Sequence, residues 1–355
     1  WLSSRPYGSG WINETLLVER EHEGRRTRWI QQHINARVFR EPARVMENVA
    51  RVTAHQRAVL LREGARDADR RALRLVPARD GLLAFVDADG EWWRTFHFIE
   101  GASSRDAVGS ALEAGAAAEA FGRFLAQLAD LPGPRLHETI PHFHDARARF
   151  EQLVAAAKAD EHGRLAGCRR DFEFVLEREA LVARSQALRG ALPERVTHND
   201  TKINNVLLDD VTSEGVCVID LDTVMPGSLL NDFGDLVRSS VSRAAEDAAS
   251  PAAEPELFEA LESAAELPRL FMPHRRQRRV TFIDQRGLGQ PRIQRRRHAI
   301  SLLLIQRPVH GDLSQPSTEA LRRTQLSNLL QGLHEDVLRQ LLRQVLVAHA
   351  AANQR

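Results

Sequence analysis

The sequence predicts an α+β fold with a small, β-rich lobe over residues 1–100 and a larger, mostly helical lobe over residues 101–355. All five tryptophans precede residue 100, and aromatic and β-branched residues favour strands. Asp89-Gly90, between two apolar runs, predicts a hairpin turn. After Gly101 the chain becomes rich in alanine and leucine, which favours helices.

The expected elements follow this division along the chain. Five runs of aromatic and β-branched residues are expected to be strands: residues 12–18, 28–34, 73–77, 82–87 and 91–99. One helix interrupts them, opening at Glu41-Pro42 with an apolar stripe that includes Val45 and Val49. Five later helices are expected over residues 107–131, 150–158, 172–188, 232–247 and 316–350.

The composition is that of a soluble globular protein. The chain has 355 residues, 43% of them hydrophobic and 27% charged, and a net charge of +1, which gives no general attraction to nucleic acids or membranes. No apolar stretch approaches a membrane span, and no signal-peptide pattern is present. The two cysteines, Cys168 and Cys217, make no metal-type spacing, so we expect a cytoplasmic protein. Because the chain opens on Trp1, we expect its natural start to lie upstream.

Two polar runs in the second lobe carry the clearest chemical signal: VTHNDTKINN at residues 196–205 and VIDLD at residues 218–222. Phosphoryl transfer from ATP needs an acceptor for the proton of the attacking hydroxyl and oxygen ligands for Mg²⁺. Asp200 fits the first role, and Asn205 with Asp220 fits the second. Lys202, one of two lysines among 49 basic residues, can reach the transferring phosphate as a compact charge.

The residues between these runs predict a catalytic hairpin over residues 196–224. Residues 206–208 and 216–219 are short apolar runs, and the polar residues between them predict a turn. Two strands folded at that turn would bring Asn205 and Asp220 side by side. A solvated polar loop could match the first run by chance, but the second run in register argues against coincidence.

Two features of the first lobe fit a nucleotide site. Gly8-Ser9-Gly10 precedes the first expected strand, where glycines let the backbone approach phosphate oxygens, although an N-terminal turn explains them equally well. Residues 98–101, which include Glu100, form a short connector along which adenine would lie. A small sheet, a connector and a helical lobe together are the layout of a protein-kinase-like enzyme.

The catalytic hairpin also resembles the aminoglycoside phosphotransferase and choline kinase superfamily, and within it the N-acetylhexosamine 1-kinase group. The likeness is dense from residue 8 to about residue 242. The matching segments are residues 8–13, 29–35, 45–48, 140–145, 198–205, 219–228 and 232–238, with weaker matches at residues 307–310 and 323–325.

This resemblance implies a kinase that uses ATP and Mg²⁺ to phosphorylate the anomeric hydroxyl of N-acetylglucosamine or N-acetylgalactosamine. Its partners would be ATP and a small sugar, with no nucleic acid and no membrane. Asp200 matches the catalytic base, Asn205 and Asp220 match the magnesium ligands, and Asp222 matches the acidic position beside them, near metal and sugar. Arg307, His310 and Arg323 are candidate sugar contacts, although salt bridges in a helical lobe would explain them equally well.

The first lobe departs from the usual kinase pattern. A typical kinase has a lysine on its third strand that holds the phosphates and pairs with a glutamate of the helix. Here the strand offers Gln32 and His33 and the helix offers Glu47, so we assign these three residues to nucleotide binding. A neutral histidine is a weaker phosphate ligand than lysine or arginine, and His33 can also be an ordinary surface residue.

A second departure is the arginine-rich segment 266–300, which does not resemble the family. We interpret it as a divergent, partly disordered segment, because it lacks interleaved aromatic residues and the whole chain is nearly neutral. Nucleic-acid binding is the alternative. Residues 311–320 look inserted, so a degenerate relative that only binds nucleotide stays open, as does an aminoglycoside- or homoserine-type acceptor.

Other polar residues fit supporting roles. His142 and His144 lack a third ligand nearby, so we expect no metal there and assign Asp145 to a helix N-terminus. Asp232 and Asp235 are expected to brace the catalytic loop through hydrogen bonds.

Overall fold

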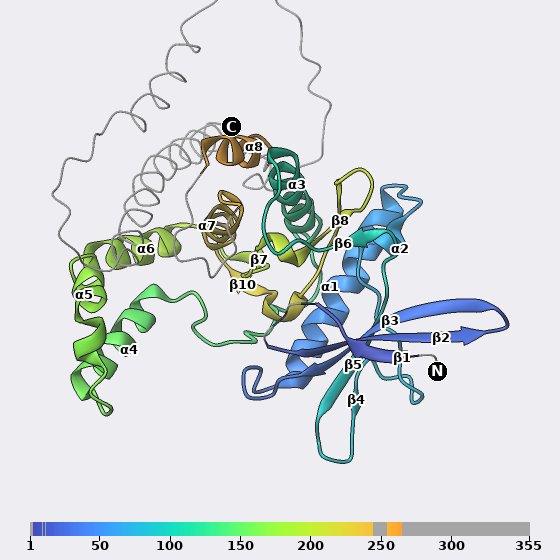
Figure 1. Cartoon of the computed structure of the whole chain (residues 1–355), viewed down its shortest axis with the longest axis horizontal. Helices are drawn as coiled ribbons and strands as arrows, with labels where there is room; N and C mark the ends of the chain where they lie inside the picture. Colours follow the sequence, from blue (N-terminus) through green and yellow to red (C-terminus); the bar gives the residue numbers. More distant parts are fainter. Residues whose placement is uncertain (1–2, 9, 11, 244–253, 265–355) are drawn as a thin grey trace, which may run out of the picture.

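The computed structural model describes residues 3–8, 10, 12–243 and 254–264, in two parts connected by residues 98–101 (Figure 1). The first part is a five-stranded antiparallel sheet with the strand order β1-β2-β3-β5-β4. Its strands are β1 (Ser3–Pro6), β2 (Glu14–His22), β3 (Arg25–Ile34), β4 (Phe85–Val86) and β5 (Trp92–His97).

Four of the five predicted strands lie in this sheet, and β1 is an additional strand that the sequence did not predict. Residues 73–77 differ from the prediction. They run beside β5 but pair with it only through the isolated bridge of Leu75 with Phe96. Two backbone hydrogen bonds flank that bridge, from Val76 N to Thr95 O and from His97 N to Arg74 O. Pro77 has no N–H to extend this ladder, which limits the segment to an irregular edge.

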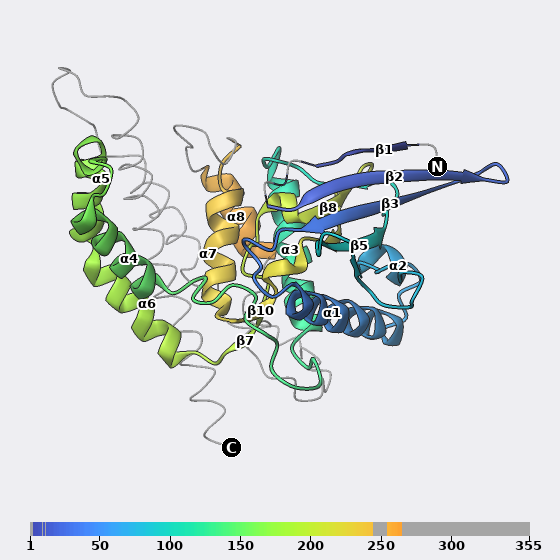
Figure 2. The same cartoon turned by 90° about the horizontal axis from the view of Figure 1, so that it is seen from below.

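Helix α1 (Pro42–Arg62) covers one face of the sheet (Figure 2). Pro42 stands in its first turn, where a missing N–H costs nothing, as the sequence predicted. The predicted apolar stripe is buried, with Val45, Val49 and Val52 at 1% exposure or less, so burial against the sheet fixes this helix. A short helix, α2 (Ala68–Arg71), follows it.

The second part is mainly helical. Its helices are α3 (Ala111–Gln127), α4 (Ala146–Ala159), α5 (Leu165–Leu176), α6 (Glu179–Ala191), α7 (Leu229–Ser240) and α8 (Pro255–Ala264). The single helix predicted over residues 172–188 is two helices, because the chain turns at residues 177–178. Helices α4 to α6 lie on the side away from the five-stranded sheet (Figures 1 and 2). The predicted α+β class and the two-part organisation are thus confirmed.

One hydrophobic core runs through both parts. It joins Val49 of α1 and Phe96 of β5 to Phe121 and Phe124 of α3, and to Leu208 in the predicted hairpin. Because the burial of apolar surface is the main stabilising term, the two parts are held together by the same core that supports the hairpin.

Several predictions concern residues outside the described part of the chain. These are Ser9, the segment 266–300, the helix over residues 316–350, Arg307, His310 and Arg323. Among the described helices, none has the length and apolar character needed to cross a membrane.

Candidate active site

Two small sheets hold two loops at the same place. Strand β7 (Arg195–Thr197) pairs antiparallel with β10 (Met225–Gly227). Strand β8 (Val206–Asp209) pairs antiparallel with β9 (Gly215–Val218) on one side and with β6 (Ala102–Ser103) on the other. The first loop, residues 198–205, runs from β7 to β8. The second loop, residues 219–224, runs from β9 to β10. Each loop is therefore fixed at both ends, next to the other.

The predicted contact between Asn205 and the segment that carries Asp220 is present. Val206 is the register partner of Val218, and Ile219 N donates a hydrogen bond to Asn205 O over 2.9 Å. The hairpin that brings these residues together is closed by Asp209, whose carboxylate accepts hydrogen bonds from Val211 N and Thr212 N. The polar turn in the sequence was the signal for this arrangement.

Within the first loop, Asn205 and Lys202 both contact Asp200. Asn205 Nδ2 donates to the Asp200 main-chain oxygen over 2.8 Å and to Asp200 Oδ2 over 2.9 Å. Lys202 Nζ lies 3.5 Å from Asp200 Oδ1. The Asp200 side chain keeps 26% of its surface exposed, so one carboxylate is oriented by an amide and a cation while it still faces solvent.

Asp220 lies across from this group in a left-handed backbone conformation, with φ 58°. The protein atoms packed around the Asp220 carboxyl and the neighbouring charges of Asp222 and Asp200 together raise its pKa to about 7, against the opposing effect of Arg94 and Lys202. Part of Asp220 still reaches solvent, but its surroundings disfavour the ionised form. The two acidic segments therefore share one site.

This site fits a magnesium ion. Asn205 and Asp220 supply an amide oxygen and a carboxylate, and Mg²⁺ takes one or two protein carboxylates and completes its shell with phosphates and water. A bound cation would also relieve the repulsion that raises the pKa of Asp220. Among the described positions, no group of three His, Cys, Asp or Glu residues is placed to hold a metal ion.

A buried network positions the catalytic loop from behind. His198 is fully buried, and its Nδ1 accepts from Asp200 N while Nε2 donates to Ile219 O over 2.9 Å. Asp232 accepts hydrogen bonds from the main-chain N–H groups of His198 and Asn199, each over 2.8 Å. Asp232 thus braces the loop as predicted. Asp235 does not, because its carboxylate pairs with Arg238.

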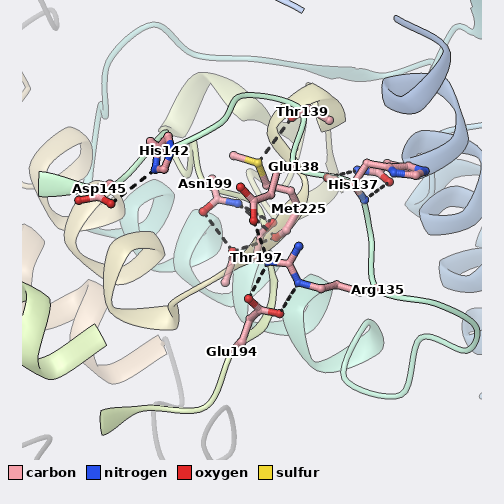
Figure 3. Close-up of polar contacts among 11 residues, drawn as sticks. Arg135, His137, Glu138, Thr139, His142, Asp145, Glu194, Thr197, Asn199 and Met225 are labelled. Atoms are coloured by element: carbon pink, nitrogen blue, oxygen red, sulfur yellow. Dashed lines mark hydrogen bonds and ion pairs between the residues drawn. The ribbon is translucent and has the colours of Figure 1, made fainter. Parts of the chain in front are cut away.

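The segment 135–145 lies beside the strands that hold the two loops (Figure 3). Thr139 Oγ1 lies 3.7 Å from Met225 Sδ, and His144 Nε2 lies 2.8 Å from Asn199 O. His142 instead lies near Asp145, which caps α4 by accepting from Ala148 N, as the sequence predicted. The two histidines therefore have separate partners.

The glycine pair of the first part lies in a hairpin loop. Because β1 precedes Gly8 and β2 follows Gly10, the segment connects two paired strands, with Tyr7 N bonded to Thr15 O over 2.9 Å. Gly8 has φ +82°, a conformation that other residues rarely adopt, and a Cβ there would meet nothing within 4 Å. The backbone at Gly8 and Gly10 therefore has no close neighbour on its Cβ side.

The nucleotide residues predicted on β3 and α1 separate in the structure. Gln32 and His33 point to opposite faces of the sheet, because side chains alternate along a strand. His33 stacks on Trp93 and lies 2.8 Å from Glu91, whereas Gln32 faces the buried side. Glu47 bonds to His137 Nε2 over 2.8 Å, so neither His33 nor Glu47 is brought to the acidic residues. Glu100 pairs with Arg28 at the connector.

Asp222 is held in an ion pair that the sequence analysis missed. Its Oδ1 accepts from Arg94 Nη1 and its Oδ2 accepts from Asn13 Nδ2 over 2.6 Å, and both charged side chains are 1% exposed. In this arrangement Asp222 faces Arg94 and Asn13 rather than an open metal or sugar site. The sequence did carry one signal for this ion pair, because Arg94 is a single charged residue in the run of aromatic residues at 92–98. In the structure Arg94 is the register partner of Gln32.

The two-part fold and the acidic site match what the sequence predicted for a small-molecule kinase. A model of the phosphotransferase enzyme family matches residues 3–277, and the chain belongs to this family. Family membership confirms the predicted enzyme class, a phosphotransferase that acts on a hydroxyl group and uses ATP with Mg²⁺.

Solved structures show more distant likenesses. A spectinomycin phosphotransferase in complex with ADP and spectinomycin is 14% identical, over 74% of this chain and 74% of that chain, with a TM-score of 0.41. An aminoglycoside phosphotransferase from Alicyclobacillus acidocaldarius is 15% identical over 76% and 77%, with a TM-score of 0.44. A microcompartment-associated aminopropanol kinase is 20% identical over 66% and 68%, with a TM-score of 0.41.

Proposed function

We propose that this phosphotransferase transfers the γ-phosphoryl group of ATP to the anomeric hydroxyl of an N-acetylhexosamine, GlcNAc or GalNAc, and forms the sugar 1-phosphate. The observation that carries the proposal is the shared site of Asp200, Asn205 and Asp220. The acceptor is inferred from the resemblance of residues 140–145 and 222–228 to the N-acetylhexosamine 1-kinase group. Both segments contact the catalytic loop, through His144 and through the β7–β10 pair.

The proposed chemistry assigns Asp200 to the acceptor hydroxyl. The carboxylate holds the hydroxyl and takes its proton as the sugar oxygen bonds to the γ-phosphorus and the bond to the β-bridging oxygen breaks, which releases ADP. In a loose transition state this proton leaves late, so the position of Asp200 matters more than its basicity. The hydrogen bonds from Asn205 supply that position.

The charges around the transferring group come from the two loops. Lys202, 3.5 Å from Asp200, would offset negative charge on the γ-phosphoryl oxygens. Asn205 and Asp220 would hold Mg²⁺, which neutralises charge on the β- and γ-oxygens when bound. Asp222 would support the site indirectly, by holding the second loop to Arg94 and Asn13.

The nucleotide would lie between the glycine hairpin and the connector. Gly8 and Gly10 would approach its phosphates, and the backbone near Glu100 would approach adenine. Gln32, like His33 and Glu47, is hydrogen-bonded to other side chains in this structure. Arg307, His310 and Arg323 stay proposed sugar contacts from the sequence.

The test is a phosphorus NMR assay of product formation with Mg-ATP. The acceptor panel contains GlcNAc, GalNAc, glucose, galactose, an aminoglycoside and homoserine, with Asp200→Ala as the background control. We expect an acid-labile 1-phosphate from an N-acetylhexosamine alone, and none from the variant. If product forms only on another acceptor, that acceptor class, and not the N-acetylhexosamines, is the substrate. Nucleotide binding without turnover on any acceptor would identify a degenerate relative.

A further inference from the structure

A row of polar side chains crosses the buried face of the sheet and ends on Asp222. Thr15, Gln32 and Arg94 are register partners on the adjacent strands β2, β3 and β5. Gln32 Nε2 donates to Thr15 Oγ1 over 3.1 Å, and Gln32 Oε1 accepts from Arg94 Nε over 3.0 Å. Arg94 Nη1 then donates to Asp222, 128 residues further along the chain. The row therefore connects three strands to the loop that carries Asp220.

Asp222 is also tied to the glycine hairpin. Asn13, three residues after Gly10, donates to Asp222 Oδ2 over 2.6 Å, and Asn13 Oδ1 accepts from Asn35 N over 3.0 Å. Asn35 Nδ2 in turn donates to Ile12 O over 3.1 Å. Both oxygens of one carboxylate are thus held by the first part of the molecule, one by the sheet and one by the segment that follows the glycine loop.

The position of Arg94 excludes one obvious role. Its side chain is 1% exposed, and its guanidinium lies 5.2 Å from the centre of the Phe96 ring. A guanidinium with so little exposed surface cannot contact the phosphates of a nucleotide in this arrangement. Arg94 therefore does not replace the strand lysine of typical kinases as a direct phosphate ligand.

A fork-shaped donor suits the role that remains. Guanidinium offers several N–H groups in a fixed plane, so Arg94 bonds Gln32 through one edge and Asp222 through another. A buried ion pair is poor evidence for stability, since desolvation offsets its attraction, but its directional bonds can fix one arrangement of the chain. Here the fixed element is the short turn η2 (Leu221–Thr223), which begins directly after Asp220.

We propose that Arg94 is a positioning residue for magnesium-nucleotide binding, which acts by locking Asp222, and with it the turn after Asp220, to the sheet. This proposal rests on the proposed function, because it assumes that Asp220 binds the metal of Mg-ATP. In this proposal, Arg94 of β5 and Asp222 of the second loop couple the sheet to the catalytic loops. The metal affinity of Asp220 then depends on a residue that never touches the ion.

The test compares Arg94→Lys with the wild-type chain and with Arg71→Lys, a matched change at the surface ion pair with Asp67 on α2. One readout is the Mg²⁺ concentration that gives half-maximal binding of a fluorescent ATP analogue. The other is amide hydrogen exchange of residues 219–225 in the protein without nucleotide. Lysine keeps the charge but lacks the planar fork that bonds Gln32 and Asp222 through two separate nitrogens. We therefore expect a magnesium midpoint raised about fivefold or more and faster exchange confined to this loop.

A midpoint for Arg94→Lys within twofold of wild type would overturn the proposal, as would an effect of the same size in Arg71→Lys. If Arg94→Lys does not fold, Gln32→Leu and Gln32→Glu are compared instead. Glutamate keeps an oxygen that accepts from Arg94, and leucine removes it. We expect Gln32→Leu alone to raise the magnesium midpoint, and equal magnesium midpoints for these two variants would overturn the proposal. A wild-type chain that binds no Mg-ATP would remove the proposed function as well, whereas normal wild-type binding with unchanged variants would remove this inference alone.

Discussion

Gly227 lies so close to Asn199 that a Cβ at residue 227 would stand 2.7 Å from Asn199 Oδ1, and 2.3 Å from Thr197 Oγ1. Asn199 is buried, has φ 65°, and donates through Nδ2 to Thr223 O over 2.9 Å. The residue before Asp200 is therefore held to the second loop by its side chain, and only a glycine at position 227 leaves room for that side chain.

We expect Gly227→Ala to destabilise the protein by about 1–3 kcal/mol, because overpacking in a rigid interior forces neighbours to move. Phosphoryl transfer should fall more than stability alone explains, since the displaced Asn199 adjoins Asp200. Gly190→Ala on α6 is the matched control, because a Cβ there meets nothing within 4 Å. Thermal melting and steady-state kinetics measure both effects, and equal behaviour of the two variants would contradict the prediction.

Asp232 should make stability depend on pH. Burial raises the pKa of its carboxyl to about 6, although the hydrogen bonds from His198 N and Asn199 N oppose that shift. A raised folded-state pKa contributes stability that is fully present below the unfolded value, near 4, and is lost as pH rises through 6. The folded protein binds the extra proton in this window, so the contribution of Asp232 decreases by up to about 3 kcal/mol from pH 4 to pH 6.

The measurement is urea unfolding of wild type and Asp232→Asn at several pH values between 4 and 7. The wild-type advantage over Asp232→Asn should shrink as pH rises, because asparagine does not titrate. Asp80→Asn, in an exposed loop, should show no such trend. A difference between wild type and Asp232→Asn that stays constant across the window would show that Asp232 ionises normally.

Local sequence determined what could be predicted here. The helix over residues 42–62 and the hairpin that joins Asn205 to Asp220 each follow from residue spacing and turn chemistry over a short stretch. Their formation needs no information from elsewhere in the chain. The carboxylate and amide of the site were therefore visible in the sequence before any fold was known.

Contacts between distant segments escaped prediction. Arg94 and Asp222 are 128 residues apart, and Glu47 and His137 are 90 apart, so only the assembled fold makes them neighbours. Strand β1 has the sequence SSRP, with no apolar alternation, and forms because β2 offers it a ladder. Gln32 and His33 must point to opposite faces, but which of them points to the buried face depends on the register of β3. A one-residue shift in register would exchange the two.

Arg70 of α2 should control the connector between the two parts. Its Nε donates to Glu100 O over 3.2 Å, and its Nη2 donates to Gly101 O over 2.8 Å and to Asp209 Oδ2 over 2.7 Å. One side chain thus fastens the connector to the turn of the catalytic hairpin. Lysine at this position has a single nitrogen and cannot keep all three bonds.

We expect Arg70→Lys to speed amide exchange in residues 99–103 and to raise the KM for ATP a few-fold, with little change in kcat. The reason is that the connector backbone would be less ordered before the nucleotide binds, which adds an entropy cost to binding. Arg57→Lys, at the surface pair with Asp69, serves as the control. Unchanged exchange in the connector would contradict this role for Arg70.

Asp200→Asn should separate catalysis from binding. Asparagine keeps one oxygen that can accept from Asn205 Nδ2, so the loop should retain its shape, but the amide cannot take the proton of the acceptor hydroxyl. We expect kcat to fall by about 10²–10⁴, the usual contribution of a positioned general base, while the KM for Mg-ATP stays within a few-fold of wild type. Asp210→Asn, at the exposed turn of the same hairpin, should leave both constants unchanged. If Asp200→Asn instead raised the KM for Mg-ATP and kept kcat, Asp200 would act on the nucleotide, and the hydroxyl would need another base.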